Sequence, residues 1–333
     1  MHIAKFFIYL SLFTFYFCLS SSNASRIEKP AFNIIPLGTS GGELENNLSS
    51  YLVAPVHSND WVALDAGTLC GGIKNIPKST LKTLGIVSAK KLFSDNIKAY
   101  LLTHAHLDHI SGLIICSTGD SNKTIIGLPS TIEHLKNHIF NWKLWPNFAN
   151  EGQEPLLKKY QYHRLELNHS NSIAKTRFTV TAYPLSHGNN YESTAFLLES
   201  NHQYLLYLGD TGADAMEHSH DLQHVWQVIA PLIKKHQLHA IFIECSYSNS
   251  QPDNMLFGHL TPKWLLRELD ELAKQVDSQH RNTALQGLTV VVTHIKQGLE
   301  ETQNKNIILN TLNNKNRWGV IFKLPQPNVL LTL

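Results

Sequence analysis

Short apolar runs recur along this chain, and most of them stop at or just before a histidine, aspartate or glutamate. Runs of this length, bounded by polar clusters, are typical of buried strands. They cover residues 32–37, 50–53, 61–64, 99–102, 178–185, 204–208, 240–243 and 288–292. Rigid strands can hold side chains from distant parts of a sequence around one point. The pattern therefore predicts a sheet protein whose polar strand ends converge on one site.

Three segments have the spacing of helices, at residues 132–140, 222–235 and 262–276. The last follows Thr261, a residue type that favours the N-cap position, and starts with Pro262, which suits the first turn. Strands interspersed with helices indicate a layered α/β fold. The 333 residues are 43% hydrophobic and 16% charged, which allows a large core. No repeat or linker-like tract divides the chain, so we expect one domain over residues 25–333.

The first 24 residues have the composition of an export signal. Lys5 precedes an apolar stretch at residues 6–19, and small residues follow up to Ala24. This order is typical of a cleavable secretory signal, with cleavage after Ala24. The apolar stretch is short for a membrane span, although an uncleaved N-terminal anchor stays open. We expect a periplasmic or secreted protein with no stable membrane insertion once residues 1–24 are removed.

The cysteines do not form the pattern of a disulfide framework. Cys18 would be lost with the signal, which leaves Cys70, Cys116 and Cys245. Three widely spaced cysteines do not make a disulfide framework, so most of the stability must come from the hydrophobic core. One disulfide bond and three buried thiols are both compatible with the sequence.

The formal net charge of +2 indicates no strongly basic surface. Proteins that bind nucleic acids usually concentrate basic residues to neutralise phosphates. We therefore expect a small-molecule substrate and no nucleic-acid partner, and the sequence leaves a homodimer open.

Residues 104–109 place three imidazoles and a carboxylate directly after an apolar run. Imidazole and carboxylate are the ligands of zinc and similar divalent ions. His104 and His106 would point the same way on an extended segment, and a turn into a following helix could aim Asp108 and His109 at a second ion. This one segment can therefore serve two metal ions.

The sequence of residues 104–109, His-Ala-His-Leu-Asp-His, resembles the His-x-His-x-Asp-His motif of the metallo-β-lactamase superfamily. That resemblance implies a four-layer αβ/βα sandwich. Residues 106–114 resemble the narrower signature of the class II cyclic nucleotide phosphodiesterases of fungi, slime moulds and some bacteria. Cys116 stands where that signature has a polar residue. Further similarity lies at residues 38–42, 48–52, 64–67, 226–232, 241–246, 258–262 and 292–296.

The resemblance implies three more ligands, each of which follows its own apolar run. His187 would complete the set of His104 and His106 around the first ion. Asp210 would bridge both ions, and His294 would join Asp108 and His109 on the second. We expect two divalent ions, zinc before manganese or cobalt.

Two such ions can hold a hydroxide between them at neutral pH, and that hydroxide would attack the phosphorus of a 3′,5′-cyclic nucleotide. Cyclic AMP is the expected substrate, and cyclic GMP stays open. The departing 3′ oxygen needs a proton or a positive partner as the 5′-nucleotide forms. His259 and Glu244 are expected to supply it, because related phosphodiesterases of this fold place a histidine and an acidic residue there. Asp108 is expected to act in catalysis as well as in binding.

Two further segments are expected to support the site. Asp65 would orient a metal-bound histidine without binding metal itself. Residues 38–42 would either bring backbone N–H groups to an anionic substrate or only turn the chain.

Other functions fit parts of this pattern. An RNA-processing endonuclease would have the same ligand order, but the export signal and the small net charge oppose it. A hydrolase of this fold that acts on a lactam, lactone or thioester is disfavoured by residues 107–113. A non-enzymatic metal-binding protein would be expected to lack a ligand, whereas all seven residue types are present.

Overall fold

Two seven-stranded sheets form the centre of the protein. The computed structural model describes residues 29–188, 191–299 and 304–333, and the expected signal at residues 1–24 lies outside them. The first sheet has the order β14-β1-β2-β3-β4-β5-β6. Its strands are β1 (Phe32–Gly38), β2 (Ser50–Pro55), β3 (Trp61–Leu64), β4 (Ile97–Leu101), β5 (Lys123–Gly127), β6 (Tyr160–Arg164) and β14 (Leu331–Thr332).

The second sheet has the order β13-β12-β11-β10-β9-β8-β7. Its strands are β7 (Ser170–Ser172), β8 (Thr179–Ser186), β9 (Glu192–Ser200), β10 (Gln203–Leu208), β11 (Leu238–Glu244), β12 (Thr289–Thr293) and β13 (Ile321–Lys323). Strands β10 to β13 are parallel, and β8 runs in the same direction because β8 and β10 both pair antiparallel with β9. The carboxyl ends of β8, β10, β11 and β12 therefore meet at one edge.

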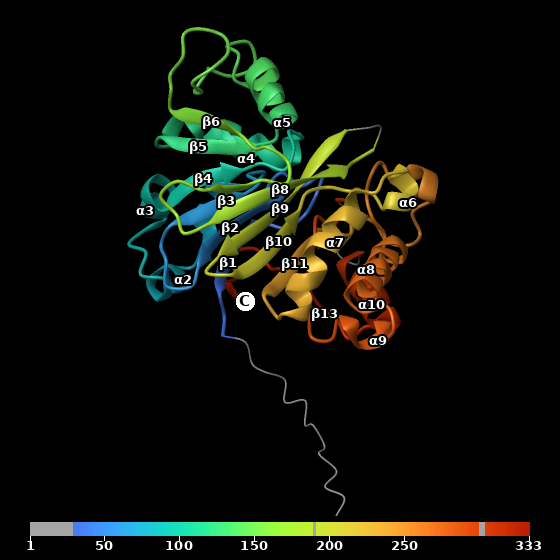
Figure 1. Ribbon diagram of the computed structural model, residues 1–333. Coiled ribbons are helices and arrows are strands. Elements are labelled where there is room, and N and C mark those ends of the chain that lie inside the picture. Colours follow the sequence, from blue (N-terminus) through green and yellow to red (C-terminus); the bar gives the residue numbers. More distant parts are fainter. Residues whose placement is uncertain (1–28, 189–190, 300–303) are drawn as a thin grey trace, which may run out of the picture.

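Helices cover the outer face of each sheet. Those beside the first sheet are α1 (Cys70–Asn75), α2 (Lys78–Thr83), α3 (Ala89–Lys91), α4 (Leu107–Cys116) and α5 (Pro129–His134). Those beside the second sheet are α6 (Asp214–Glu217), α7 (Asp221–Lys234), α8 (Pro262–Val276), α9 (Arg281–Ala284) and α10 (Asn304–Lys315). Figure 1 shows α7, α8, α9 and α10 on one side of the sheets and α2 and α3 on the other.

The two-residue period of the strands explains this layering. In β11, Ala240 and Phe242 lie in the core between the sheets, whereas Ile241 and Ile243 pack against helices. In β1, Ile34 faces the other sheet and Ile35 faces the helices. Strands that are apolar on both faces need a covering layer on each side. The expected four-layer αβ/βα sandwich is confirmed.

The strands lie where the apolar runs predicted them, and β3 coincides with its run. The helix expected at residues 132–140 starts earlier, because Pro129 occupies its first turn, and it continues after His134 as a π-helical turn at Leu135–Ile139. Thr261 precedes α8 as expected, but its side chain makes no capping hydrogen bond.

Cys70 and Cys116 form a disulfide bond, and Cys245 is a buried free thiol. The bond joins the start of α1 to the end of α4. Among the residues that the structure describes, no helix is long and apolar enough to cross a membrane.

Candidate active site

Seven side chains from both sheets converge at the carboxyl ends of the strands. His104 and His106 follow β4, and Asp108 and His109 lie in the first turn of α4. The other three are His187 after β8, Asp210 after β10 and His294 after β12. They form two groups that share Asp210, and the possible ligand atoms within each group lie within 4.8 Å of one another. The structure thus brings together all seven residues that the sequence singled out as ligands.

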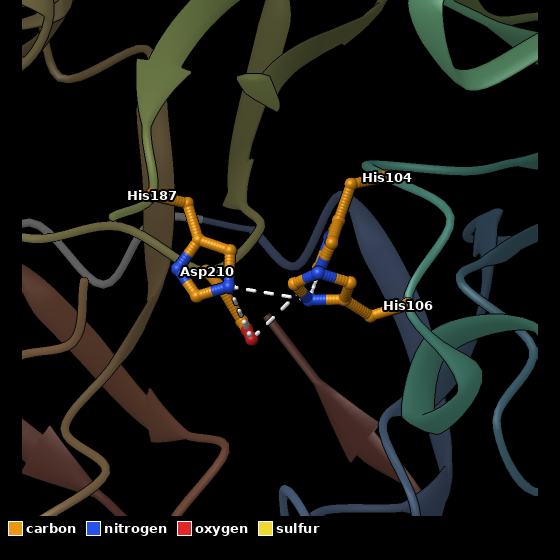
Figure 2. A group of neighbouring side chains, drawn as sticks. All are labelled: His104, His106, His187 and Asp210. Carbon is orange, nitrogen blue, oxygen red and sulfur yellow. Dashed lines mark hydrogen bonds and ion pairs between the residues drawn. The ribbon is translucent and has the colours of Figure 1, made fainter. Parts of the chain in front are cut away.

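The first group contains His104, His106, His187 and Asp210. Nδ1 of His106 lies 3.1 Å from Nε2 of His104 and 3.3 Å from Nε2 of His187. Oδ2 of Asp210 lies 3.8 Å from Nε2 of His104 and 3.8 Å from Nε2 of His187. Figure 2 shows the three rings and the carboxylate turned toward a common point.

The second group contains Asp108, His109, His294 and Asp210. Nε2 of His294 lies 3.1 Å from Oδ2 of Asp108 and 3.2 Å from Oδ2 of Asp210. Nε2 of His109 lies 3.2 Å from Oδ1 of Asp210. The two oxygens of Asp210 thus face different histidines of the same group, and Oδ2 also faces the first group.

The spacing of these atoms fits a divalent cation. Four donors at zinc bond lengths of about 2.0–2.1 Å in a tetrahedron would stand about 3.3–3.4 Å apart. The closest donor pairs lie 3.1–3.3 Å apart, and Oδ2 of Asp210 is 3.8 Å from its two partners in the first group. Nε2 of His109 is buried, and its 3.2 Å contact with Oδ1 of Asp210 lacks the geometry of a hydrogen bond, so it makes none to any residue that the structure describes. A buried nitrogen left in this way needs a partner, and a cation in the second group would provide one.

The charge states of three of the donors suit such a cation. Burial lowers the pKa of His104 below its ordinary value and that of His106 to about 4. Burial would raise the pKa of Asp210, but His294 and His109 outweigh this effect, and the pKa lies well below its ordinary value. Divalent ions bind neutral imidazole and ionised carboxylate, so these groups are in the required forms.

Asp65 stands behind the second group, as the sequence predicted. Its Oδ2 lies 2.8 Å from Nδ1 of His109, and it also accepts hydrogen bonds from the backbone and hydroxyl of Thr103 and from the hydroxyl of Tyr207. The φ angle of Asp65 is +54°, a conformation that non-glycine residues rarely adopt. The fold therefore holds this carboxylate in a position that orients the His109 ring.

The loop at residues 38–42 packs against the second group. The backbone N–H of Gly42 donates to Oδ2 of Asp108 at 3.0 Å. A Cβ atom on Gly41 would lie only 2.0 Å from the ring of His294, so a larger residue would displace that histidine. The loop thus contacts two proposed ligands, a role that the sequence did not predict, and the two roles expected from the sequence stay predictions.

His259 and Glu244 form a buried pair beside the second group. Nδ1 of His259 lies 2.8 Å from Oε1 of Glu244 and 3.9 Å from Oδ2 of Asp210. Glu244 also accepts a hydrogen bond from the backbone N–H of Thr211 at 2.9 Å. Burial would raise the pKa of Glu244, but the adjacent His259 outweighs it and lowers the pKa. An ionised Glu244 can only accept hydrogen bonds, so Nδ1 of His259 carries the proton in this contact.

Three residues at the site were not singled out from the sequence. The ring of Tyr191 stacks on His106, with centroids 4.4 Å apart. Glu217 accepts from the backbone N–H of Gly188 at 2.8 Å, next to His187. The hydroxyl of Ser246 lies between Glu244 and His294. Only Ser246 had a sequence signal, because residues two apart on an extended segment point the same way.

The comparison with known proteins gives consistent results. A family model of class-II cAMP phosphodiesterases matches residues 31–327. The chain is 38% identical to a probable 3′,5′-cyclic-nucleotide phosphodiesterase of Yersinia pestis, over 92% of this chain and 90% of that protein. It is 36% identical to a 3′,5′-cyclic-nucleotide phosphodiesterase of Aliivibrio fischeri, over 93% of this chain and 94% of that protein.

Solved structures show the same fold. Unliganded yeast PDE1 superposes with a TM-score of 0.80 at 24% identity, over 92% of this chain and all (100%) of that one. The metallo-beta-lactamase fold protein YhfI of Bacillus subtilis superposes with a TM-score of 0.56 at 14% identity, over 91% of this chain and 99% of that one. The resemblance seen in residues 104–114 is thereby confirmed over almost the whole described chain. On the family model and the two bacterial relatives together, the chain belongs to the class-II cAMP phosphodiesterases.

Proposed function

We propose that this enzyme hydrolyses 3′,5′-cyclic nucleotides, cyclic AMP first among them, to 5′-nucleotides at the site formed by the two groups. The observation that carries the proposal is the position of the His259–Glu244 pair beside two donor groups that share Asp210. The match to a phosphodiesterase family supports this chemistry. A site with two donor groups supports it too, because the His259–Glu244 pair, here called the acid pair, lies beside them.

The donor groups would hold two divalent ions, one with His104, His106 and His187 and one with Asp108, His109 and His294. When bound, two such ions lower the pKa of a water molecule and offset negative charge on a phosphoryl group. We propose zinc as the usual metal, because imidazole is the main ligand, with manganese or cobalt as substitutes. Asp108 would serve catalysis through its place among the second set of ligands.

The acid pair would act on the leaving 3′ oxygen. Glu244 accepts from Nδ1–H of His259, so Nε2 would be the atom that faces the leaving oxygen, and it would donate there when the ring carries a second proton. A buried, ionised partner keeps Nδ1 protonated and fixes the orientation of the ring. The ribose oxygen is a poor leaving group without a proton, so this step would affect natural substrates most.

We further propose that residues 1–24 direct export and that residues 25–333 form one domain in the periplasm or outside the cell. The disulfide bond between Cys70 and Cys116 supports an oxidising compartment. The core between the two sheets draws residues from both, as a single domain would. N-terminal sequencing of protein from its native source should begin near Ser25, and an intact Met1 would contradict export by cleavage.

A panel of substrates tests the activity. The purified, zinc-loaded mature chain would be incubated with 3′,5′- and 2′,3′-cyclic nucleotides, a bis-aryl phosphodiester, a lactam and a tRNA precursor. We expect 5′-nucleotides from the 3′,5′-cyclic substrates, as identified by chromatography. Cleavage of the tRNA precursor alone would favour the endonuclease, and cleavage of the lactam alone would favour a lactamase.

A further inference from the structure

Ser246 lies two residues after the end of β11, and its hydroxyl is fully buried between the acid pair and the second donor group. Its Oγ lies 2.6 Å from Oε2 of Glu244 and 3.0 Å from Nδ1 of His294. It also lies 3.3 Å from Nδ1 of His259 and 3.0 Å from the carbonyl oxygen of His294. One hydroxyl thus contacts a proposed metal ligand and both members of the acid pair.

The chemistry of the neighbours decides the direction of these hydrogen bonds. A serine hydroxyl has one proton to donate, and the contact with the Glu244 carboxylate is the shortest. Ser246 therefore donates to Glu244, and its oxygen accepts from Nδ1–H of His294. In the neutral ring that binds a metal ion, this arrangement leaves Nε2 of His294 without a proton, facing Asp108 and Asp210. Nε2 is the atom through which His294 would bind the second ion.

Glu244 accepts a hydrogen bond from each side in this arrangement. Oε2 accepts from Ser246, and Oε1 accepts from Nδ1–H of His259 at 2.8 Å. A continuous path of hydrogen bonds thus runs from His294 through Ser246 and Glu244 to His259. It fixes Nδ1 as the protonated nitrogen of both histidines, so that Nε2 of His294 can face a cation and Nε2 of His259 can face the leaving oxygen.

We propose that Ser246 is a positioning residue that couples the second metal-binding group to the acid that protonates the leaving oxygen. This inference rests on the proposed function, because the roles of His294 as a metal ligand and of His259 as a proton donor are both taken from it. The hydroxyls of Ser193 and Ser200 are also buried but make no hydrogen bond to any described residue, so the four contacts of Ser246 set it apart from them. The contacts of Ser246 therefore point to the site and not to packing alone.

The test compares Ser246→Ala with Ser200→Ala, which removes another buried hydroxyl at the last residue of β9. Zinc affinity is measured by competition with a chromogenic chelator, and melting temperature is measured alongside. Removing a group that orients a ligand typically lowers metal affinity about 10–100-fold. We expect that loss for one zinc ion of Ser246→Ala only, the same ion that His294→Ala weakens, with the other zinc ion unchanged and Ser200→Ala like the wild type. Equal loss of both zinc ions, or of neither, would overturn the proposal.

A second measurement reads the other end of the path. The rates of each variant are compared on cyclic AMP and on a bis-nitrophenyl phosphodiester, whose leaving group departs without a proton. Ser246→Ala should lose about 10–100-fold on cyclic AMP and clearly less on the aryl ester. Equal losses on both substrates would contradict a link to the acid. The zinc measurement needs no substrate, so failure of the proposed activity would be distinguishable from failure of this inference.

Ser246→Thr separates hydrogen bonding from packing, because threonine keeps the hydroxyl. The proposal expects its zinc affinity and its rate ratio between the two substrates to return toward those of the wild type. If the threonine variant is folded and as impaired as the alanine variant, the effect belongs to packing and the assignment to Ser246 is wrong.

Discussion

The two donor groups share Asp210 but are held by different kinds of neighbour. In the first group the groups that hydrogen-bond the imidazole rings directly are neutral: the hydroxyl of Thr103 lies 3.0 Å from Nδ1 of His104, and the carbonyl of Gly258 lies 2.9 Å from Nδ1 of His187. In the second group a buried carboxylate, Asp65, holds His109. The second group therefore has more negative charge around it than the first.

The pKa values reflect this difference. In the first group, burial lowers the pKa of His104 and His106. In the second, burial would also lower the pKa of His109 and His294, but Asp210 and the other carboxylates outweigh it and raise both. A surplus of negative charge favours a divalent cation, so we infer that the second group binds its ion mainly by charge. The first would bind mainly through three imidazoles set at fixed distances.

The largest effect is expected at the residue common to both groups. Asp210→Ala removes a donor from each, and we expect loss of both ions and of measurable hydrolysis of cyclic AMP. Elemental analysis of the purified variant checks the metal content. Asp60→Ala, at a half-exposed carboxylate that pairs with Lys98, serves as the control and should retain both ions. A variant at Asp210 that keeps both ions would mean that Asp210 is not shared.

The next effect should separate chemistry from metal binding. His259→Ala should keep both ions, because His259 is proposed as a proton donor, and should lower turnover of cyclic AMP about 10²–10⁴-fold. His294→Ala should instead weaken the second ion, with activity partly restored at high zinc. The positions of Glu244, His259 and His294 could also hold a cation between them. Loss of a metal ion in His259→Ala would therefore indicate that His259 is the metal ligand and His294 the proton donor.

A smaller effect is expected from the carboxylate behind the second group. Asp65→Asn keeps the shape of the side chain but removes its charge, and we expect about 10–100-fold weaker binding of one ion only. Chelator competition gives the two affinities separately. Equal weakening of both ions would show that Asp65 supports the whole site, and the contrast between the groups would then be wrong.

The smallest effect is expected from the corresponding change beside the first group. Tyr191→Leu removes a ring that stacks on His106, the most exposed of the seven proposed ligands. Aromatic pairs contribute about 0.5–1.5 kcal/mol, so affinity for the first ion should fall about 2- to 10-fold. Tyr191→Phe keeps the ring and should behave like the wild type. If Tyr191→Leu lowers metal affinity as much as Asp65→Asn does, the neutral contacts of the first group and the charged contacts of the second group are equally important, and the proposed difference between them is wrong.

Much of this architecture was predictable because burial leaves a local signal. The runs before Asp65 and His104 are strands, and their polar ends meet as expected, since strand ends in such folds share an edge. β5, β6, β7, β9, β13 and β14 were not predicted. β9 begins and ends with the polar residues Glu192 and Ser200, and Lys123 opens β5 with a charged residue that is buried beside Asp120. Pairing with neighbouring strands, and not local composition, determines such segments.

The supporting contacts of the site were less predictable than its ligands. Asp65 could be expected because it follows an apolar run directly. Tyr191 contacts His106 across 85 positions of sequence, and Gly258 contacts His187 across 71, so only the folded chain shows them. The same holds for Gly41, whose small size matters because the ring of His294 lies against it. Such contacts depend on three-dimensional packing that one sequence does not record.

The central claim is that two divalent ions in the shared site are required for hydrolysis of cyclic AMP. Titration of metal-free protein with zinc tests it most directly, with the rate on cyclic AMP and the bound zinc measured in the same samples. We expect no activity at zero zinc and a rise to a plateau near about two zinc ions per chain. Full activity in protein that elemental analysis shows to be free of metal would contradict the account.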